Sequence, residues 1–153
     1  MDKKLDDFDL AILAQLQRDA AQSVDDIAAR VSLSRNACWR RIRLMEDNGV
    51  IRGRVALADP GRVGCPLSVV VLLRTSAHEP GWMDRFQSAV RAMPEVIGAY
   101  RMTGDLDYML RVRVADVPAY DAFYKRLIAR VPVSDISASF VMEEIKETTA
   151  LPL

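Results

Sequence analysis

The arginines between residues 35 and 54 are the residues of this 153-residue sequence best suited to bind a polyanion. A guanidinium can donate two hydrogen bonds to guanine O6 and N7, and an asparagine amide can pair with adenine in the same way. Cys38, Ile42 and Met45 recur at i, i+4 and i+7, which indicates a helix that is apolar on one side. The sequence therefore predicts a helix that presents its arginines together, on the opposite face, to a DNA major groove.

Two kinds of DNA contact are expected from this segment. Side chains near the start of the helix should reach base edges. These are Ser34, Arg35, Asn36, Trp39 and Arg40. The remaining arginines should bind phosphates, which adds affinity without sequence information. These are Arg41, Arg43, Arg52 and Arg54. The alternative is a solvated helix face held by salt bridges.

A second candidate site is the segment Thr-Gly-Asp-Leu-Asp-Tyr at residues 103–108. A tight turn at Gly104 would leave backbone amides free to bind a carboxylate, and the carboxylates of Asp105 and Asp107 could bind an ammonium group. Together these groups suit an α-amino acid. The alternative is an ordinary hairpin turn, which the residues taken alone favour.

The overall charge is zero, with 21 basic and 21 acidic residues, but the charges are segregated. Residues 35–43 hold four arginines and no acid, whereas residues 2–26 hold seven aspartates. A local basic face is enough to attract DNA, so neutrality does not exclude a nucleic-acid partner. The only histidine, His78, is assigned no role.

Several functional classes are disfavoured by composition. Two cysteines, Cys38 and Cys65, are too few for a disulfide framework, and no CxxC pair suggests zinc. No nucleophile set, metal cluster or phosphate loop is visible, so we expect no enzyme activity, no cofactor and no metal. The N-terminus is charged and no apolar run approaches about 20 residues, so we expect a cytoplasmic protein without a membrane partner.

The chain should form an α+β protein with two domains. Helices are predicted over about 6–18, from Ser23 onward, and from Ser34 to Gly49, followed by two short strands of a wing over 50–57. This gives a winged helix-turn-helix domain at 1–58 and a linker at 59–66, which is rich in glycine and proline.

The domain at 67–153 should be a ferredoxin-like βαββαβ sandwich. Its strands are expected at 67–74, 96–102, 108–114 and 136–146, with helices over 82–93 and after Asp116. Val69, Val71, Met109 and Val141 are expected on the sheet face that the helices leave open. Such an apolar face needs a cover, so we predict a homodimer joined through the sheets.

The order of these elements and four local segments resemble the Lrp/AsnC family of bacterial transcription regulators. The segments are LDDFDLAIL at 5–13, LSRNAC at 33–38, TGDLDY at 103–108 and VMEEIK at 141–146. The resemblance covers the whole chain. It implies DNA binding by the first domain and amino-acid sensing with oligomerisation by the second, in dimers that often assemble into octamers with effectors between dimers.

Four further segments are similar to a subgroup that includes a cysteine-responsive regulator, which makes L-cysteine the first candidate effector. They lie at 38–42, 93–98, 120–127 and 148–152. The resemblance also places the effector on the turn and on the start of the last strand, where Ser137 and Ser139 occupy positions that often hold threonine. The resulting effector set is Thr103, Gly104, Asp105, Asp107, Tyr108, Ser137 and Ser139.

We therefore expect a sequence-specific, amino-acid-responsive transcription regulator. The alternative is an architectural DNA-binding protein without an effector. An enzyme built on the second domain is a remote third reading.

Overall fold

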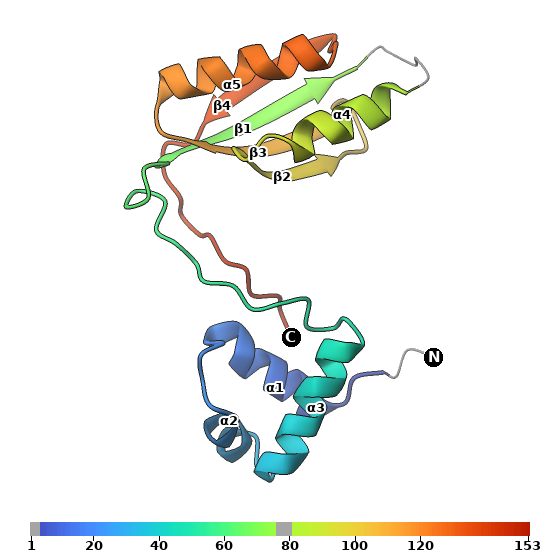
Figure 1. Ribbon diagram of the computed structural model, residues 1–153, viewed down its shortest axis with the longest axis vertical. Helices are drawn as coiled ribbons and strands as arrows, with labels where there is room; N and C mark the ends of the chain where they lie inside the picture. Colours follow the sequence, from blue (N-terminus) through green and yellow to red (C-terminus); the bar gives the residue numbers. More distant parts are fainter. Residues whose placement is uncertain (1–3, 76–80) are drawn as a thin grey trace. The chain divides into compact units, whose positions relative to one another are not determined.

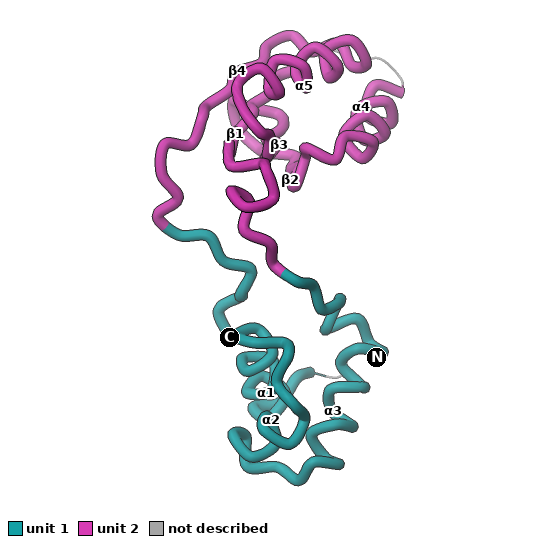
Figure 2. Tube along the Cα trace, turned by 60° about the vertical axis from the view of Figure 1, so that its left-hand side comes forward, with its two compact units in different colours: residues 1–56, 146–153 teal, residues 57–145 magenta. Residues whose placement is uncertain are grey.

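The structure is a computed structural model that describes residues 4–75 and 81–153. The chain divides into two compact units, coloured separately in Figure 2. One comprises residues 1–56 together with 146–153, and the other comprises residues 57–145. His78 lies outside the described residues.

The first unit contains three helices, α1 (Asp7–Arg18), α2 (Val24–Arg30) and α3 (Arg35–Asp47). Ser23 caps α2 by accepting a hydrogen bond from the Asp26 backbone N–H, and Ser34 caps α3 in the same way through Ala37. Such caps satisfy N–H groups that the first turn of a helix leaves free. After α3, Gly49 has a φ of +72°, which glycine adopts without steric cost. The predicted starts and end of these helices are confirmed.

One apolar core joins the three helices of the first unit. Its buried side chains include Ile12 of α1, Ile27 of α2, and Cys38, Ile42 and Met45 of α3. Because α3 contributes only one side to this core, its opposite side is left to solvent, as its sequence period predicted.

The second unit contains a four-stranded antiparallel sheet and two helices (Figure 1). The strands are β1 (Leu67–Arg74), β2 (Val96–Arg101), β3 (Tyr108–Val114) and β4 (Asp135–Phe140). The helices are α4 (Trp82–Arg91) and α5 (Val117–Arg130). The spatial order β2-β3-β1-β4 is that of a ferredoxin-like sandwich, so the predicted α+β class and this topology are confirmed.

The sheet packs against its helices through alternate residues of the two central strands. Val69 and Val71 of β1 are fully buried beside Leu110 and Val112 of β3, and Phe123 of α5 packs on them. The open-face position predicted for Val69 and Val71 is therefore wrong. Their neighbours Val70 and Leu72 occupy that face, where Leu72 pairs with Met109.

The register correction has a simple cause. Residues 67–73 are apolar at nearly every position, so alternation within β1 cannot say which side faces the helices. A shift of one residue exchanges the two faces of a strand.

Two predicted strand regions differ from the structure. Residues 50–57, predicted as the two short strands of a wing, form no strand, and Val55 is 79% exposed, because this segment finds no partner strand among the described residues. The last strand ends at Phe140 rather than near Lys146. Its partner β1 begins only at Leu67, and the Val141 N–H donates to Ser68 O at 3.0 Å as the pairing ends.

The C-terminal residues Lys146–Leu153 belong to the first unit. The Leu151 N–H donates to Gln17 Oε1 at 2.6 Å, and Gln17 Nε2 donates to Leu151 O at 3.2 Å. One glutamine of α1 thus binds both polar groups of a tail residue, whereas the sequence alone assigned this tail to the second domain. Among the described helices, none has the length and apolar character needed to cross a bilayer.

Candidate nucleic-acid interface and effector region

The solvent side of α3 carries the polar residues that the sequence singled out. Side chains advance by about 100° per residue around a helix, so Asn36, Arg40 and Arg43 lie opposite the buried stripe. All three are exposed, and Trp39 beside them is 52% exposed. This face can therefore contact a groove without unpacking the helix.

Three of the six candidate arginines are held by weak surface ion pairs. Arg35 contacts Asp25 at 3.2 Å, and Arg43 and Arg54 both contact Glu46, at 3.2 and 3.0 Å. Exposed pairs of this kind contribute about 0–1 kcal/mol, so a phosphate or a base edge can replace the carboxylate. Arg40 and Arg52 make no ion pair with any residue that the structure describes.

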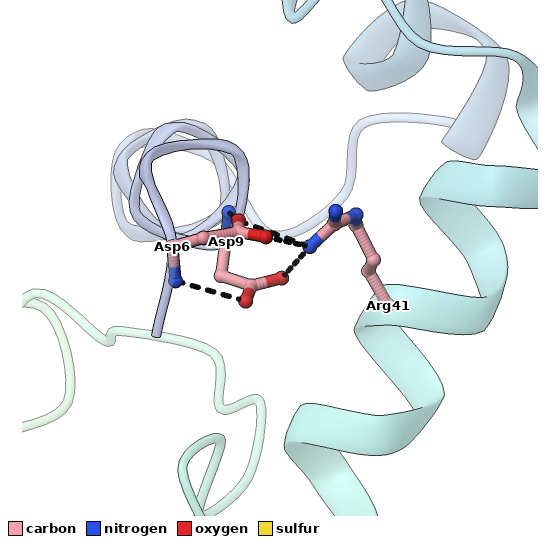
Figure 3. Close-up of polar contacts among 3 residues, drawn as sticks. All are labelled: Asp6, Asp9 and Arg41. Carbon is pink, nitrogen blue, oxygen red and sulfur yellow. Dashed lines mark hydrogen bonds and ion pairs between the residues drawn. The ribbon is translucent and has the colours of Figure 1, made fainter. Parts of the chain in front are cut away.

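Arg41 departs from the expected surface and faces α1 (Figure 3). Its Nη1 donates to Asp6 Oδ2 at 2.8 Å and to Asp9 Oδ1 at 2.7 Å, and its guanidinium lies over the Phe8 ring, 5.5 Å from the centroid. The side chain is only 26% exposed. The expectation that every arginine of α3 lies on one face is thus wrong for Arg41, because its position on the helix points toward α1.

The Arg41 contact also involves the cap of α1. Asp6 and Asp9 form a capping box, in which each side chain accepts from the other's backbone N–H. The hydrogen bond from the Asp9 N–H, with help from Arg41, lowers the pKa of Asp6 against a smaller opposing effect of burial. The side chains of Asp9 and Asp6 in turn raise the pKa of Arg41. We call this set of three residues the Asp6–Asp9–Arg41 cluster.

The proposed effector turn joins β2 to β3. Gly104 has a φ of +108°, so this position favours glycine whatever the surrounding space. The Met102 N–H donates to Asp107 O at 2.8 Å and closes the turn. Thr103, Gly104 and Asp105 are exposed, so their polar groups can meet a ligand.

Asp107 has a structural contact that the sequence did not reveal. Its Oδ2 accepts a hydrogen bond from the Thr75 N–H at 2.7 Å, and its own N–H donates to Leu73 O at 3.0 Å. Arg74, at the end of β1, donates from Nε to the Asp105 carbonyl at 2.7 Å. Arg74 was not assigned to this region from the sequence. The signal was present, because Arg74 is the charged residue that directly follows the apolar run of β1.

The two serines of the predicted effector set lie on β4. Ser137 pairs with Leu72 and Ser139 with Val70, so both serines lie on the open face of the sheet. Strand β1 separates β4 from β3, a distance of about 9.5 Å for two strand spacings. Within one chain, the serines and the turn are therefore separate patches, with Arg74 at the end of the strand between them.

Tyr108 differs from the rest of the predicted effector set because it lies in the core. It is 6% exposed, and its ring centroid is 4.6 Å from that of Phe86 and 5.5 Å from that of Trp82. Its hydroxyl contacts Met83 Sδ at 3.4 Å. The structure therefore places this ring beneath the helices rather than at the surface of the turn.

Neither cysteine forms a disulfide. Cys38 is buried in the first unit, where burial raises the pKa of its thiol, and Cys65 is half-buried. Within residues 4–75 and 81–153, no group of histidine, cysteine, aspartate and glutamate could hold a metal ion.

Both halves of the chain match known family descriptions. The Lrp/AsnC ligand binding domain matches residues 68–151, and a winged helix-turn-helix DNA-binding domain matches residues 5–52. The chain is 48% identical to the Glutamate uptake regulatory protein of Zymomonas mobilis, over 100% of this chain and 93% of that protein. It is 47% identical to the DNA-binding transcriptional activator DecR of Escherichia coli, over 97% and 99%.

Solved structures give the same result. An AsnC family transcriptional regulator from Agrobacterium tumefaciens has a TM-score of 0.93 and 51% identity, with 97% of each chain covered. A transcriptional regulator from Neisseria meningitidis in complex with L-Met has a TM-score of 0.93 and 33% identity, again over 97% of each chain.

The depressed pKa of Asp6 predicts an acid-sensitive first unit. A carboxyl group with a lowered pKa in the folded state stabilises the fold above its unfolded value of about 3.8, and loses that effect as pH falls through the folded pKa. The free energy of unfolding should therefore decrease below about pH 4, and Asp6→Asn should reduce this dependence. Urea unfolding from pH 6 to pH 2.5 in a Trp82→Phe background, with Trp39 fluorescence as the signal, measures it.

Asp7→Asn is the matched control, because Asp7 is an exposed neighbour that makes no side-chain hydrogen bond or ion pair with any described residue. It should keep the pH dependence of the parent protein. If Asp6→Asn and Asp7→Asn reduced the pH dependence of the unfolding free energy equally, a specific role for the Asp6–Asp9–Arg41 cluster would be contradicted.

Proposed function

Because this chain belongs to the Lrp/AsnC family of DNA-binding transcriptional regulators, we propose that it is a sequence-specific regulator whose activity responds to a small amino acid. The observation that carries the proposal is the solvent side of α3. Asn36, Arg40 and Arg43 are exposed there, while the opposite side of the helix is fully packed. A rigid helix with hydrogen-bond donors along one side is what major-groove reading requires.

The ion pairs around α3 support a division of labour on DNA. Asn36 and Arg40 can meet base edges directly, since Arg40 pairs with no carboxylate of the described residues, and Arg35 can do so by leaving Asp25. Ser34 and Trp39 flank these residues, and an apolar ring can contact a thymine methyl group. Arg43, Arg52 and Arg54 are suited to phosphates. Arg41, held in the Asp6–Asp9–Arg41 cluster, would instead position α3 against α1.

The open face of the sheet supports a homodimer. Val70, Leu72 and Met109 are only half-buried there, and Tyr100 on the neighbouring strand is 46% exposed. A second copy that packs on this face would shield these apolar side chains from water. Two copies related by a two-fold axis would bring two α3 helices to a pseudo-palindromic site. Assembly of such dimers into octamers is a further expectation from the family.

The turn supports binding of an α-amino acid. Backbone N–H groups around Gly104 can bind a carboxylate, and the exposed Asp105 can bind the ammonium group. Since β1 separates the turn from Ser137 and Ser139, we expect these serines to contact the effector through a neighbouring copy. That arrangement agrees with the family, in which effectors lie between dimers.

The effector's side chain is proposed from resemblance. L-Cysteine is the first candidate, because four segments of the chain are similar to the subgroup that includes a cysteine-responsive regulator. The relatives justify two more candidates, since one is named for glutamate uptake and another was solved with L-Met. An architectural DNA-binding protein would instead give the same DNA footprint whichever amino acid is added.

Replacement of Arg40 by alanine should affect sequence discrimination. Arg40→Ala should weaken the cognate site by roughly 1–3 kcal/mol and relax the preference at one base pair. Arg52→Ala, its control in the phosphate-binding group, should weaken cognate and random DNA alike and lower the salt slope by about one phosphate contact. Fluorescence anisotropy titrations on both DNAs at several salt concentrations measure this. Equal losses on both DNAs for both variants would overturn the division of labour.

Loss of the Asp105 charge should weaken effector binding. Asp105→Asn should raise the Kd for the effector roughly tenfold, because a charge-assisted hydrogen bond contributes about 1.5–3 kcal/mol. A thermal-shift screen of the twenty amino acids identifies the effector, and isothermal titration then gives the Kd. Asp121→Asn on α5 is the control and should bind as the parent does. If no amino acid binds the parent protein, the sensing role is wrong.

A charge on the open sheet face should prevent dimer formation. Leu72→Asp would bury a carboxylate in the proposed interface, at a cost of several kcal/mol, and should give a monomer in multi-angle light scattering at micromolar concentration. Ile128→Asp is the control, since Ile128 is 40% exposed on α5, and it should leave the dimer intact. A monomeric parent protein would refute this interface.

A further inference from the structure

A cavity lies between α4 and β2, on the side of the sheet that the helices cover. Its volume is about 420 Å³, and small-molecule sites typically measure about 300–1,000 Å³. The cavity shares no lining residue with the exposed part of the effector turn. It is therefore a separate feature of the second unit.

The cavity opens because of a small residue on the edge strand. Ala99 pairs with Leu110 and Arg101 pairs with Tyr108, so both face the same side as the core. Ala99 is nevertheless exposed, since α4 does not extend over this part of β2. A larger side chain at position 99 would occupy the space.

The floor of the cavity is apolar and well packed. Phe86 of α4 and Tyr108 of β3 contribute to it, with ring centroids 4.6 Å apart. Trp82 stacks on Phe86 at 5.1 Å from behind. Each ring is held by its neighbours, so the floor would need no rearrangement to accept a flat or branched apolar group.

The rim of the cavity is cationic, and none of the described residues that line it carries a negative charge. Arg91 and Arg101 line it together with Gln87, and no aspartate or glutamate is among the lining residues. Arg91 has only a long contact of 3.5 Å with Gln87 Oε1, and Arg101 contacts no polar partner in the described part of the chain. Guanidinium groups without a carboxylate favour an anion, to which they can donate two hydrogen bonds.

We propose that this cavity binds an organic acid that has an aromatic or branched apolar body and no ammonium group, the class that includes the 2-oxo acids. The apolar body lies on Phe86 and Tyr108, and the carboxylate binds Arg101 and Arg91. An amino acid of the same shape should bind more weakly, because its ammonium group would lie beside two guanidinium groups and no described lining residue offers a carboxylate to neutralise it. The proposal for this cavity can hold or fail whether or not an amino acid binds at the turn.

Phenylpyruvate and L-phenylalanine test the proposal, because they share a body and differ in the oxo and ammonium groups. Isothermal titration of the full chain should give saturable binding of phenylpyruvate, at least tenfold tighter than that of phenylalanine. Arg101→Gln should weaken phenylpyruvate at least tenfold by removing the anion partner. Ala99→Leu should do the same by filling the cavity, with every charge retained.

Arg62→Gln is the matched control, since Arg62 is exposed in the same unit and lines no part of this cavity. It should bind phenylpyruvate as the parent does. Thermal unfolding checks that each variant is folded. If Ala99→Leu is unstable, the phenylpyruvate affinity of Arg101→Gln alone tests the proposal. The proposal is overturned if phenylpyruvate shows no saturable binding, if phenylalanine binds as tightly, or if Arg101→Gln leaves the affinity unchanged. A parent protein that binds phenylpyruvate but no amino acid would refute only the effector proposal.

Discussion

The one-sided packing of α3 is the constraint on which the DNA-binding surface depends. Cys38, Ile42 and Met45 meet every packing need of the helix, so no arginine is required in the core. The Asp6–Asp9–Arg41 cluster then ties α3 to the first turn of α1, 32 to 35 residues earlier in the sequence. A helix held by a core on one side, and at its flank by one guanidinium nitrogen that donates to two carboxylates, has little freedom to rotate. Its outer residues therefore keep a fixed spacing, as sequence-specific reading needs.

The acidic partners of the arginines bear on how a chain of zero net charge would discriminate between DNA sequences. In the free protein Asp25 pairs with Arg35, and Glu46 is shared by Arg43 and Arg54. On random DNA each of these arginines would exchange a carboxylate for a phosphate, with little net gain. On a matching site Arg35, the one of these three arginines that we assign to a base edge, would gain two oriented hydrogen bonds to guanine instead. Such pairing lowers non-specific affinity more than specific affinity, so the modest charge of the first unit favours discrimination.

Much of the fold was predictable because its signals are local. Ser23, Ser34 and Asp116 cap helices where the sequence placed them, and β3 shows a clean alternation of buried and half-buried residues. The errors arose where the answer depends on a distant partner. The helix-facing side of β1 is set by its register with β3, and the direction of Arg41 is set by Asp6. The cavity beside Ala99 depends on how far α4 covers an edge strand, which no local pattern records.

The two ligand surfaces proposed for the second unit have opposite chemistry, and one strand connects them. The turn offers the exposed carboxylate of Asp105, whereas the described lining of the cavity offers guanidinium groups and no carboxylate. Asp107 anchors the turn to the end of β1, and the next residue, Tyr108, forms part of the cavity floor and contacts Met83 of α4. If a shift of the turn moved β3, it would therefore also move Tyr108 in the floor of the cavity. Binding at either surface would then alter the affinity of the other by the same factor, since such coupling is reciprocal. An amino acid and its deaminated acid would in this way act on one sheet from two sides.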